Sequence, residues 1–570
     1  VNDGKDYVTD AEKASVLNAY FASQTDLKVP AGHDIKADAP APSSFLRSIK
    51  VTHRKVLRLL LSLNEKKATG SDKVPASFLK AVAHVLCKPL AHIFTLSLKT
   101  GVFPELWKIV DVVALHKKKS KSVPGNYRPI SLLSIMSKVF EHLVNDRLKR
   151  FLGPKLNPHV FRGGHQTLDL LTTMSQSWTD ALRARKEVRV VALDISKAFD
   201  RVWHDGLLHK LEALGVRGSL LAWLRSFLSG RTQRVVVNGV GSEFLPINAG
   251  VPQGSVLAPL LFLVFINDLF DVIQNELDVF ADDSTLWAIV PSVSLRKSVA
   301  DSMSADLAAI ENWAKRWLVT FNSGKTESLI ISSHQDLTAF RSNPLDKDGK
   351  LTFGPAPCPH PHLVFCGRTL PESLSFKVVG LTFTCKLLGE HTFPNIAKSA
   401  TKAICHLYRA RHVISRSQLA TIYKSHVRSR LEYCSPVWLG APATSLALLD
   451  RVQAKAAKLL GHTEATQLQS LAHRRGVAAL CAFHRIVHRT APAPLWPLCP
   501  PRAPVRASTR SHARFFVLPR VNATTPTYWI RSFIPLMTVH WNSLPPAVQS
   551  DKNPRSFKTT VNLSLDHSFL

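Results

Sequence analysis

Two apolar runs of strand character each end in carboxylates, and this feature constrains the fold more than any other. The first run, residues 191–193, leads to Asp194; the second, residues 279–281, leads to Asp282 and Asp283. Runs rich in β-branched and aromatic residues predict strands. Two-metal phosphoryl transfer needs carboxylates from neighbouring strands, because together they hold two cations about 3.5–4 Å apart. The sequence therefore predicts a sheet whose strands present these three aspartates.

An Asp-Asp pair taken alone is more often a solvated turn than a site. The residues that follow this pair argue against that interpretation, because Ser284–Val290 resumes an apolar run of strand character. Strand, acidic tip and strand together predict a hairpin whose tip offers both carboxylates.

A glycine-containing loop and an apolar segment lie between the two acidic regions. The loop, residues 248–259, carries Gly250 and Gly254, which let the backbone approach a ligand closely. Pro252 stiffens the turn, and Gln253 offers an amide to a base or a sugar. The apolar run at 260–269 suits a buried helix and is too short to span a bilayer, which takes roughly 20 residues.

In this order, the segments resemble the palm of reverse transcriptases, specifically those of non-LTR (LINE-like) retrotransposons of the jockey type. Asp194 is similar to the aspartate of the first catalytic motif, Phe280–Asp283 to the aromatic-X-Asp-Asp motif, and residues 250–257 to the loop between them. Further resemblances follow the family's order at residues 67–72, 126–133, 325–326, 377–381, 422–433 and 541–545. The resemblance implies an α+β fold, the right-hand polymerase of fingers, palm and thumb, with a helical N-terminal region and a small C-terminal module.

The resemblance and the segment composition together predict a sequential domain order. Apolar residues recur at helical spacing in the expected thumb, and proline-rich clusters near 491–504 mark the expected linker. The expected domains are a helical N-terminal extension (1–100), fingers (101–190), a palm with the catalytic Asp triad (191–390), a helical thumb (395–465), and a basic linker with a C-terminal module (466–570).

The catalytic and metal-binding roles come from the resemblance. It implies two Mg²⁺ ions, with Mn²⁺ as an alternative, held by Asp194, the backbone carbonyl of Ile195, Asp282 and Asp283. Carboxylates this close repel one another and raise a pKa unless a cation is bound, which favours the metal. Lys325 resembles the lysine proposed to protonate the leaving pyrophosphate; the alternative is a surface lysine beside a turn.

Four residues are expected to contact the incoming nucleotide: Lys117, Arg128, Phe199 and Gln253. Arg128 and one lysine of 117–119 would reach the triphosphate, since guanidinium groups bind phosphate in bidentate fashion; the alternative is a solvated surface. Phe199 stands five residues after Asp194, where the family keeps a steric gate against the 2′-OH; the alternative is a core phenylalanine. Asp200 is expected to cap or pair rather than to bind metal.

The expected template and primer contacts are Phe161, Arg162, Gly254 and Gly380. Phe161 and Arg162 remain from a family motif, Gln-X-Gly-Phe-Arg followed by Ser-Thr, that residues 157–167 otherwise lack. This departure indicates an altered grip on the template. Gly380 lies in the segment that resembles the primer grip.

The charge of the chain indicates a polyanionic partner. Lys and Arg number 73 against 41 Asp and Glu, a formal net charge of +32. Phosphate neutralisation supplies most non-specific affinity for nucleic acid, so the expected partners are an RNA template, a DNA primer or target DNA, and dNTPs. No amphipathic anchor points to a membrane. Eight scattered cysteines and the lack of a secretory signal predict an intracellular protein, in cytoplasm and nucleus. The first residue, Val1, suggests a piece of a longer polyprotein.

Two further motifs are weaker. Cys358 and Cys366, with His360 and His362 between them, lack the usual zinc-ligand spacing, and a proline-rich hairpin connection is the favoured interpretation. Gly324-Lys-Thr lacks the second glycine of a phosphate-binding loop.

The sequence thus predicts an RNA-directed DNA polymerase that extends a DNA primer on an RNA template by two-metal phosphoryl transfer, in target-primed reverse transcription. The main alternative is a catalytically inactive nucleic-acid-binding relic of a mobile element, which the altered template motif keeps open. An RNA-templated RNA polymerase is disfavoured by Phe199 at the gate position.

Overall fold

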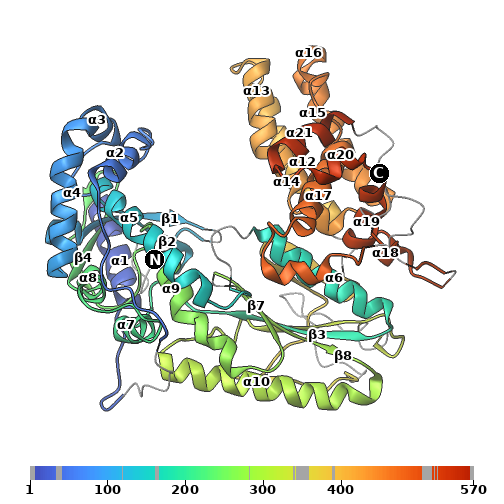
Figure 1. Cartoon of the computed structure of the whole chain (residues 1–570), viewed down its shortest axis with the longest axis horizontal. Helices are drawn as coiled ribbons and strands as arrows, with labels where there is room; N and C mark the ends of the chain where they lie inside the picture. Colours follow the sequence, from blue (N-terminus) through green and yellow to red (C-terminus); the bar gives the residue numbers. More distant parts are fainter. Residues whose placement is uncertain are drawn as a thin grey trace. The chain divides into compact units, whose positions relative to one another are not determined.

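A computed structural model describes residues 7–33, 42–117, 120–160, 166–281, 283–337, 341, 358–387, 392–502, 516–518, 520–522 and 524–564. The chain is a mixed α+β protein (Figure 1). It divides into two compact units, the first made of Val1–Arg162, Asp194–Ile273 and Ala308–Asn322, the second of Gly163–Leu193, Gln274–Leu307 and Ser323–Leu570. Both units are discontinuous in sequence.

The first unit contains a five-stranded sheet with the order β2–β1–β4–β5, and β6 pairs with β4. β1 is antiparallel to β2 and parallel to β4. The strands are β1 (Ile109–His116), β2 (Tyr127–Leu132), β4 (Arg231–Val237), β5 (Val240–Gly241) and β6 (Leu245–Ile247). Its described helices include α1 (Asp10–Gln24), α2 (His53–Leu61), α3 (Ala76–Ala81), α4 (Ala83–Thr100), α5 (Ile135–Leu152), α7 (His204–Ala213), α8 (Ser219–Leu228) and α9 (Ala258–Ile266).

Helix α1 begins where Thr9 and Glu12 form a reciprocal capping box, each side chain bonding the other's backbone N–H. The helix buries Ala14 and Phe21, seven residues apart and so on one face, against Val112 and Val235 of the sheet. Aromatic rings pack between α4 and α5. Phe94 stacks on Phe140 with ring centroids 4.3 Å apart.

Helix α9 is the apolar segment predicted between the acidic regions, and it is a helix with all but its second residue, Pro259, buried. It continues into the 3₁₀ segment Asn267–Val272, which carries Asp268. The Nζ of Lys210 lies 2.6 Å from Oδ1 of Asp268 and 3.7 Å from the ring centroid of Trp317. Trp313 donates to the same carboxylate at 2.9 Å. Burial lowers the pKa of Lys210 to about 8.

The second unit is built on a four-stranded sheet with the order β7–β8–β3–β9. The strands are β7 (Glu276–Phe280), β8 (Asp283–Val290), β3 (Glu187–Asp194) and β9 (Glu327–Ile331). β3 pairs antiparallel with β9 and is buried along most of its length, which suits the apolar run at 190–193. Trp178 of α6 (Thr167–Arg183) packs edge-on to Trp287 of β8, with ring centroids 6.2 Å apart. Helix α10 (Arg296–Trp317) runs from this unit into the first.

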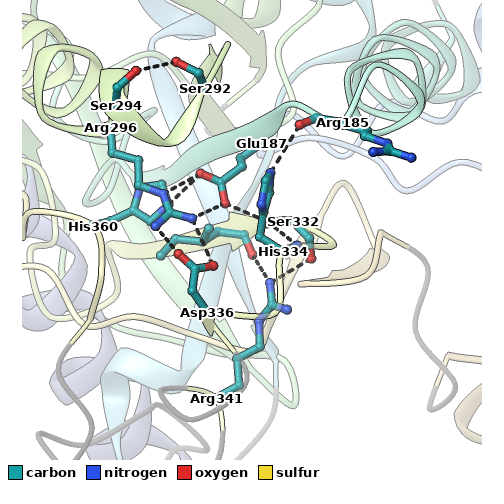
Figure 2. Close-up of polar contacts among 11 residues, drawn as sticks. Arg185, Glu187, Ser292, Ser294, Arg296, Ser332, His334, Asp336, Arg341 and His360 are labelled. Atoms are coloured by element: carbon teal, nitrogen blue, oxygen red, sulfur yellow. Dashed lines mark hydrogen bonds and ion pairs between the residues drawn. The ribbon is translucent and has the colours of Figure 1, made fainter.

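A buried ion-pair network joins the start of β3 to the start of α10 (Figure 2). The guanidinium of Arg296 donates two hydrogen bonds of 2.7 Å to Glu187 and also binds Asp336. Ser332 donates to Glu187 at 2.7 Å, and Nε2 of His360 lies 3.1 Å from the same carboxylate. Burial opposes the charge on Glu187, but His360, Arg296 and Ser332 outweigh burial and hold its pKa well below the usual range. The ion pairs of this network therefore hold the start of β3 against the start of α10.

Two small hairpins complete the sheets of this unit. They are β10 (Val364–Phe365) with β11 (Arg368–Thr369), and β12 (Ser375–Val378) with β13 (Leu381–Thr384). The remaining described helices of the second unit include α12 (Thr392–Ala410), α13 (Arg416–Ile422), α14 (Ser429–Glu432), α15 (Ala443–Leu460), α16 (His462–Ala465), α17 (Leu471–Val487), α18 (Thr527–Ile530), α19 (Phe533–Ser543), α20 (Pro546–Ser550) and α21 (Pro554–Ser564).

The C-terminal helices share one hydrophobic cluster. Phe483 of α17, Trp541 of α19 and Phe557 of α21 are at most 1% exposed and belong to it. Trp529 Nε1 of α18 donates to Asp180 Oδ1 of α6 at 2.6 Å. This bond joins the C-terminal helices to α6, which packs on the sheet through Trp178. The segment expected as a basic linker thus contains α17, a buried helix of this core. Among the described residues, none of the helices combines the length and apolar composition needed to cross a membrane.

Candidate active site

Asp194 is the last residue of β3, and its side chain is half-buried. Its backbone carbonyl accepts the N–H of Asn322 at 2.8 Å, and the N–H of Ser196 donates to Thr320 at 2.8 Å. Ile195 between them forms an isolated antiparallel bridge with Phe321. In such a non-hydrogen-bonded pair, the bonds come from the flanking residues, and the carbonyl of the central residue points away from its partner. The Ile195 carbonyl is therefore left out of this pairing.

Asp283 is the first residue of β8 and is exposed. It pairs with Phe280, so only Ala281 and Asp282 connect β7 to β8. Ala281 has a φ of 55°, the left-handed conformation that tight two-residue hairpins use at their first turn position. The predicted hairpin is confirmed. Asp282 lies outside the described residues.

The strands that carry these acids are neighbours, because β8 lies between β7 and β3 in the sheet. The donors of Asp194, Ile195 and Asp283 are all oxygen atoms, which suit Mg²⁺ better than a soft metal. This donor set fits the expected cation. Among the described residues, which exclude Asp282, no group of three or more His, Cys, Asp or Glu side chains is placed to hold a metal.

The loop before α9 requires its glycines because it approaches the chain's own backbone. Gly250 has a φ of 87°, and a Cβ there would lie 2.6 Å from the carbonyl oxygen of Asp200. Gly254 has a φ of 122°, and a Cβ would lie 2.7 Å from the carbonyl oxygen of Ser131. The atoms closest to these two glycines in the structure are therefore backbone atoms of the protein itself. The sequence had predicted a ligand at this position.

Gln253 and Asp200 pair directly. The Gln253 Nε2 donates to Asp200 Oδ1 at 2.6 Å, as expected for an Asp200 that pairs. Burial raises the pKa of Asp200, while Gln253, Lys197 and Lys117 act in the opposite direction. The side-chain amide expected to meet the nucleotide thus has a protein partner in this structure.

Phe199 is half-buried and stacks on Phe262 of α9, with centroids 4.8 Å apart and planes 25° apart. Its ring is therefore held by the core on one side. Arg128 lies on β2 opposite Leu115 and is exposed. Lys117 directly follows β1, is exposed, and its N–H donates to the carbonyl of Asn126 at 2.8 Å. Both basic residues thus lie at or beside the β1–β2 hairpin end.

Two expected residues lie on turns of the second unit. Lys325 is exposed on the turn that leads into β9. Gly380, at φ 84°, closes the two-residue turn between β12 and β13, and Tyr433 donates from its hydroxyl to the carbonyl of Val379 at 2.6 Å. The hairpin expected as primer grip is thereby bound to the turn that directly follows α14. Phe161 and Arg162 lie outside the described residues.

The histidines between Cys358 and Cys366 do not gather with the cysteines around a metal in the part of the chain that the structure describes. His360 instead faces Glu187, and a two-stranded hairpin follows at β10–β11. The hairpin interpretation of this segment therefore stays a prediction, with a two-stranded hairpin beginning at its C-terminal end.

One buried acid near the site was not expected from the motifs. Glu141 of α5 is fully buried and bonds the residues between Gln253 and α9. The only signal in the sequence is a single acid among the apolar residues Val139, Phe140, Leu143 and Val144.

Comparison with known proteins gives a family match at residues 115–383, to the family described as reverse transcriptase (RNA-dependent DNA polymerase). Three similar relatives come from Drosophila melanogaster. The probable RNA-directed DNA polymerase from transposon BS is 29% identical over 67% of this chain. The RNA-directed DNA polymerase from mobile element jockey is 29% identical over 71%, and the probable polymerase from transposon X-element is 27% identical over 74%.

The matched region covers 41%, 43% and 45% of these relatives, so the chain spans less than half of their length. Among solved structures, apo telomerase from Candida tropicalis truncated from the C-terminal domain has a TM-score of 0.33 and 13% identity, over 54% of this chain and 60% of that one.

Proposed function

Because the chain belongs to the reverse transcriptases of non-LTR retrotransposons, we propose that it extends a DNA primer on an RNA template, using dNTPs. The observation that carries this proposal is the strand order, since the strand ending at Asp194 adjoins the strand beginning at Asp283. In the same proposal, the β1–β2 region serves as fingers, the β7–β8–β3–β9 sheet as palm, and the helices from α12 as thumb. The primer would be nicked target DNA, as in target-primed reverse transcription.

Asp194, Asp282, Asp283 and the Ile195 carbonyl would hold the two Mg²⁺ ions. Bound there, such ions stabilise the charge on the attacking and leaving oxygens of an in-line displacement. Oxygen donors at the ends of adjacent strands support this assignment.

The chain's own residues would bind and orient the nucleotide. Lys117 and Arg128 are exposed, so their side chains can reach solvent-borne triphosphate. Phe199 is backed by Phe262, which would keep the ring firm against a 2′-OH. Lys325, exposed on its turn, would give a proton to the leaving pyrophosphate.

Primer extension tests the proposal. Purified protein, an RNA template with annealed DNA primer, dNTPs and Mg²⁺ should give extended DNA. Asp194→Asn should lower the rate at least about a thousandfold, because a metal-holding charge is lost, while RNA affinity stays within a few-fold. Asp205→Asn is the matched control, since Asp205 is an exposed aspartate on α7 paired only with Arg225 among its described contacts.

Two results would contradict the proposal. Extension that persists in Asp194→Asn would remove this residue from the site. A wild-type chain that binds RNA yet extends no primer would favour the inactive nucleic-acid-binding relic.

A further inference from the structure

Glu141, in the middle of α5, is 0% exposed, yet its carboxylate is fully engaged. Oε2 accepts the Ser255 hydroxyl at 2.5 Å and the backbone N–H groups of Val256 and Leu257 at 2.7 and 3.3 Å. Oε1 accepts the Ser137 hydroxyl at 3.0 Å. Four donors therefore converge on one buried carboxylate.

Three of these donors belong to the loop that enters α9. Helix α9 begins at Ala258, and its first N–H groups have no partner within the helix. Ser255 accepts from Leu257 and Ala258 at 3.0 and 3.2 Å, and Glu141 supplies a negative charge beside that end. Ser255 thus accepts the first N–H group of α9, while Glu141 binds Ser255 and the N–H groups of Val256 and Leu257 directly before the helix. Glu141 therefore fixes the segment from which α9 starts.

Other contacts also hold this loop. The carbonyl of Gln253 accepts the N–H of Ser131 at 2.8 Å. On the other side, the N–H groups of Gly250 and Val251 donate to Val202 and Phe199, both at 2.8 Å. Glu141 thus holds the C-terminal end of a loop whose earlier residues are held by other contacts.

Two residues expected to meet the nucleotide depend on this loop. Gln253 lies two residues before Ser255, and its amide reaches Asp200 at 2.6 Å. Phe199 bonds the loop through its carbonyl and stacks on Phe262 of α9, the helix whose start Glu141 fixes. A shift of the loop would therefore move both groups together.

A buried carboxylate is costly to desolvate, and an apolar side chain would fill the space at lower cost. Resting on the polymerase function proposed above, we infer that Glu141 is a positioning residue for the incoming nucleotide. It holds the 253–257 segment so that Gln253 and Phe199 face the sugar and base correctly. In this role Glu141 would act through the loop and would not itself contact the nucleotide.

Single-nucleotide incorporation on an RNA template with a DNA primer tests the inference, with KM and kcat measured for one dNTP and its rNTP. Glu141→Met keeps the length of the side chain but removes every acceptor. It should raise the dNTP KM about tenfold, because loop donors are left unpaired, and change kcat by less than about threefold. Discrimination against the rNTP should fall as well.

Glu141→Gln is the conservative variant. Its carbonyl can still accept from the loop, and its amide can donate to Ser137, so the dNTP KM should return most of the way to the wild-type value. Ser137→Ala is the matched control, since it removes the one bond of this carboxylate that does not involve the loop. Its KM should equal that of the wild-type chain.

The outcomes are separable. An active wild-type chain whose dNTP KM is unchanged in Glu141→Met, or equally raised in Ser137→Ala, overturns the inference alone. A wild-type chain without primer extension overturns the inference and the proposed function together. If Glu141→Met does not fold, Ser255→Ala decides: a raised dNTP KM supports the inference, and an unchanged one overturns it.

Discussion

The side-chain amide of Gln253 donates to the carboxylate of Asp200 across 2.6 Å, joining the loop before α9 to the turn after β3. Both residues are half-buried, and burial raises the pKa of Asp200. The hydrogen bond between Gln253 and Asp200 therefore stabilises the fold, while the negative charge of the Asp200 carboxylate is disfavoured by its burial. The stability of the chain should accordingly depend on the charge of Asp200, and so on pH.

Asp200→Asn should be at least as stable as the wild-type chain at pH 7. A carboxyl whose pKa is raised above 3.8 on folding keeps its proton to a higher pH than in the unfolded chain. The cost of the buried charge is thus fully present at neutral pH and disappears as the pH falls through the raised pKa. The amide oxygen of the substituted side chain would accept the same bond from Gln253 without that cost.

Chemical denaturation midpoints across pH 4–7 check this prediction, with the exposed Asp205→Asn as control. The advantage of Asp200→Asn should shrink towards low pH. A variant that is less stable than the wild-type chain at pH 7 would show that the ionised carboxylate is required.

Phe199→Val should admit ribonucleotides about tenfold more readily, because the ring that would meet the 2′-OH is removed. The ratio of rNTP to dNTP incorporation measures the effect. Phe262→Leu is the control, since it removes the same stacked pair from the α9 side and leaves Phe199 in place. Equal ratios in both variants would make Phe199 a packing residue only.

Lys210→Met should remove an increase in the free energy of unfolding that the wild-type chain shows at alkaline pH. Burial holds the pKa of Lys210 near 8 against 10.5 for the free side chain, so the unfolded chain binds more protons between these values. The contribution of this group to the free energy of unfolding therefore increases as the pH goes from about 8 to 10.5. Lys210→Met should show a flatter pH dependence over that window, measured by denaturation. An equal change in Lys99→Met, an exposed lysine of α4, would contradict the assignment.

Trp541→Ala should destabilise the second unit by about 3–5 kcal/mol, since it empties the centre of the C-terminal cluster. Trp496→Ala is the matched control, because Trp496 is 41% exposed and its loss should cost far less stability.

A chain cut after residue 500 should lose cooperative unfolding, because Phe533, Trp541 and Phe557 are then missing from the cluster. A truncated chain with the wild-type midpoint would show that the C-terminal helices form a separate module.

The local elements of the candidate site were predictable from the sequence. The β7–β8 hairpin follows from an acidic pair that lies between two apolar runs. Helix α9 follows from one uninterrupted apolar segment. Such patterns are short, so each residue's environment is set by its neighbours in the chain. The ordered motifs predicted a reverse transcriptase, and residues 115–383 match that family.

The sequence by itself determined which residues end strands and turns: Asp194 at the end of β3, Asp283 at the start of β8, Gly380 between β12 and β13. Only the tertiary structure decided their partners. Gln253 meets Asp200 from 53 residues away, Glu141 meets Ser255 from 114, and Trp529 meets Asp180 from 349. A buried polar group must find a partner, but which donor reaches it depends on how distant segments pack, and no local pattern encodes that choice.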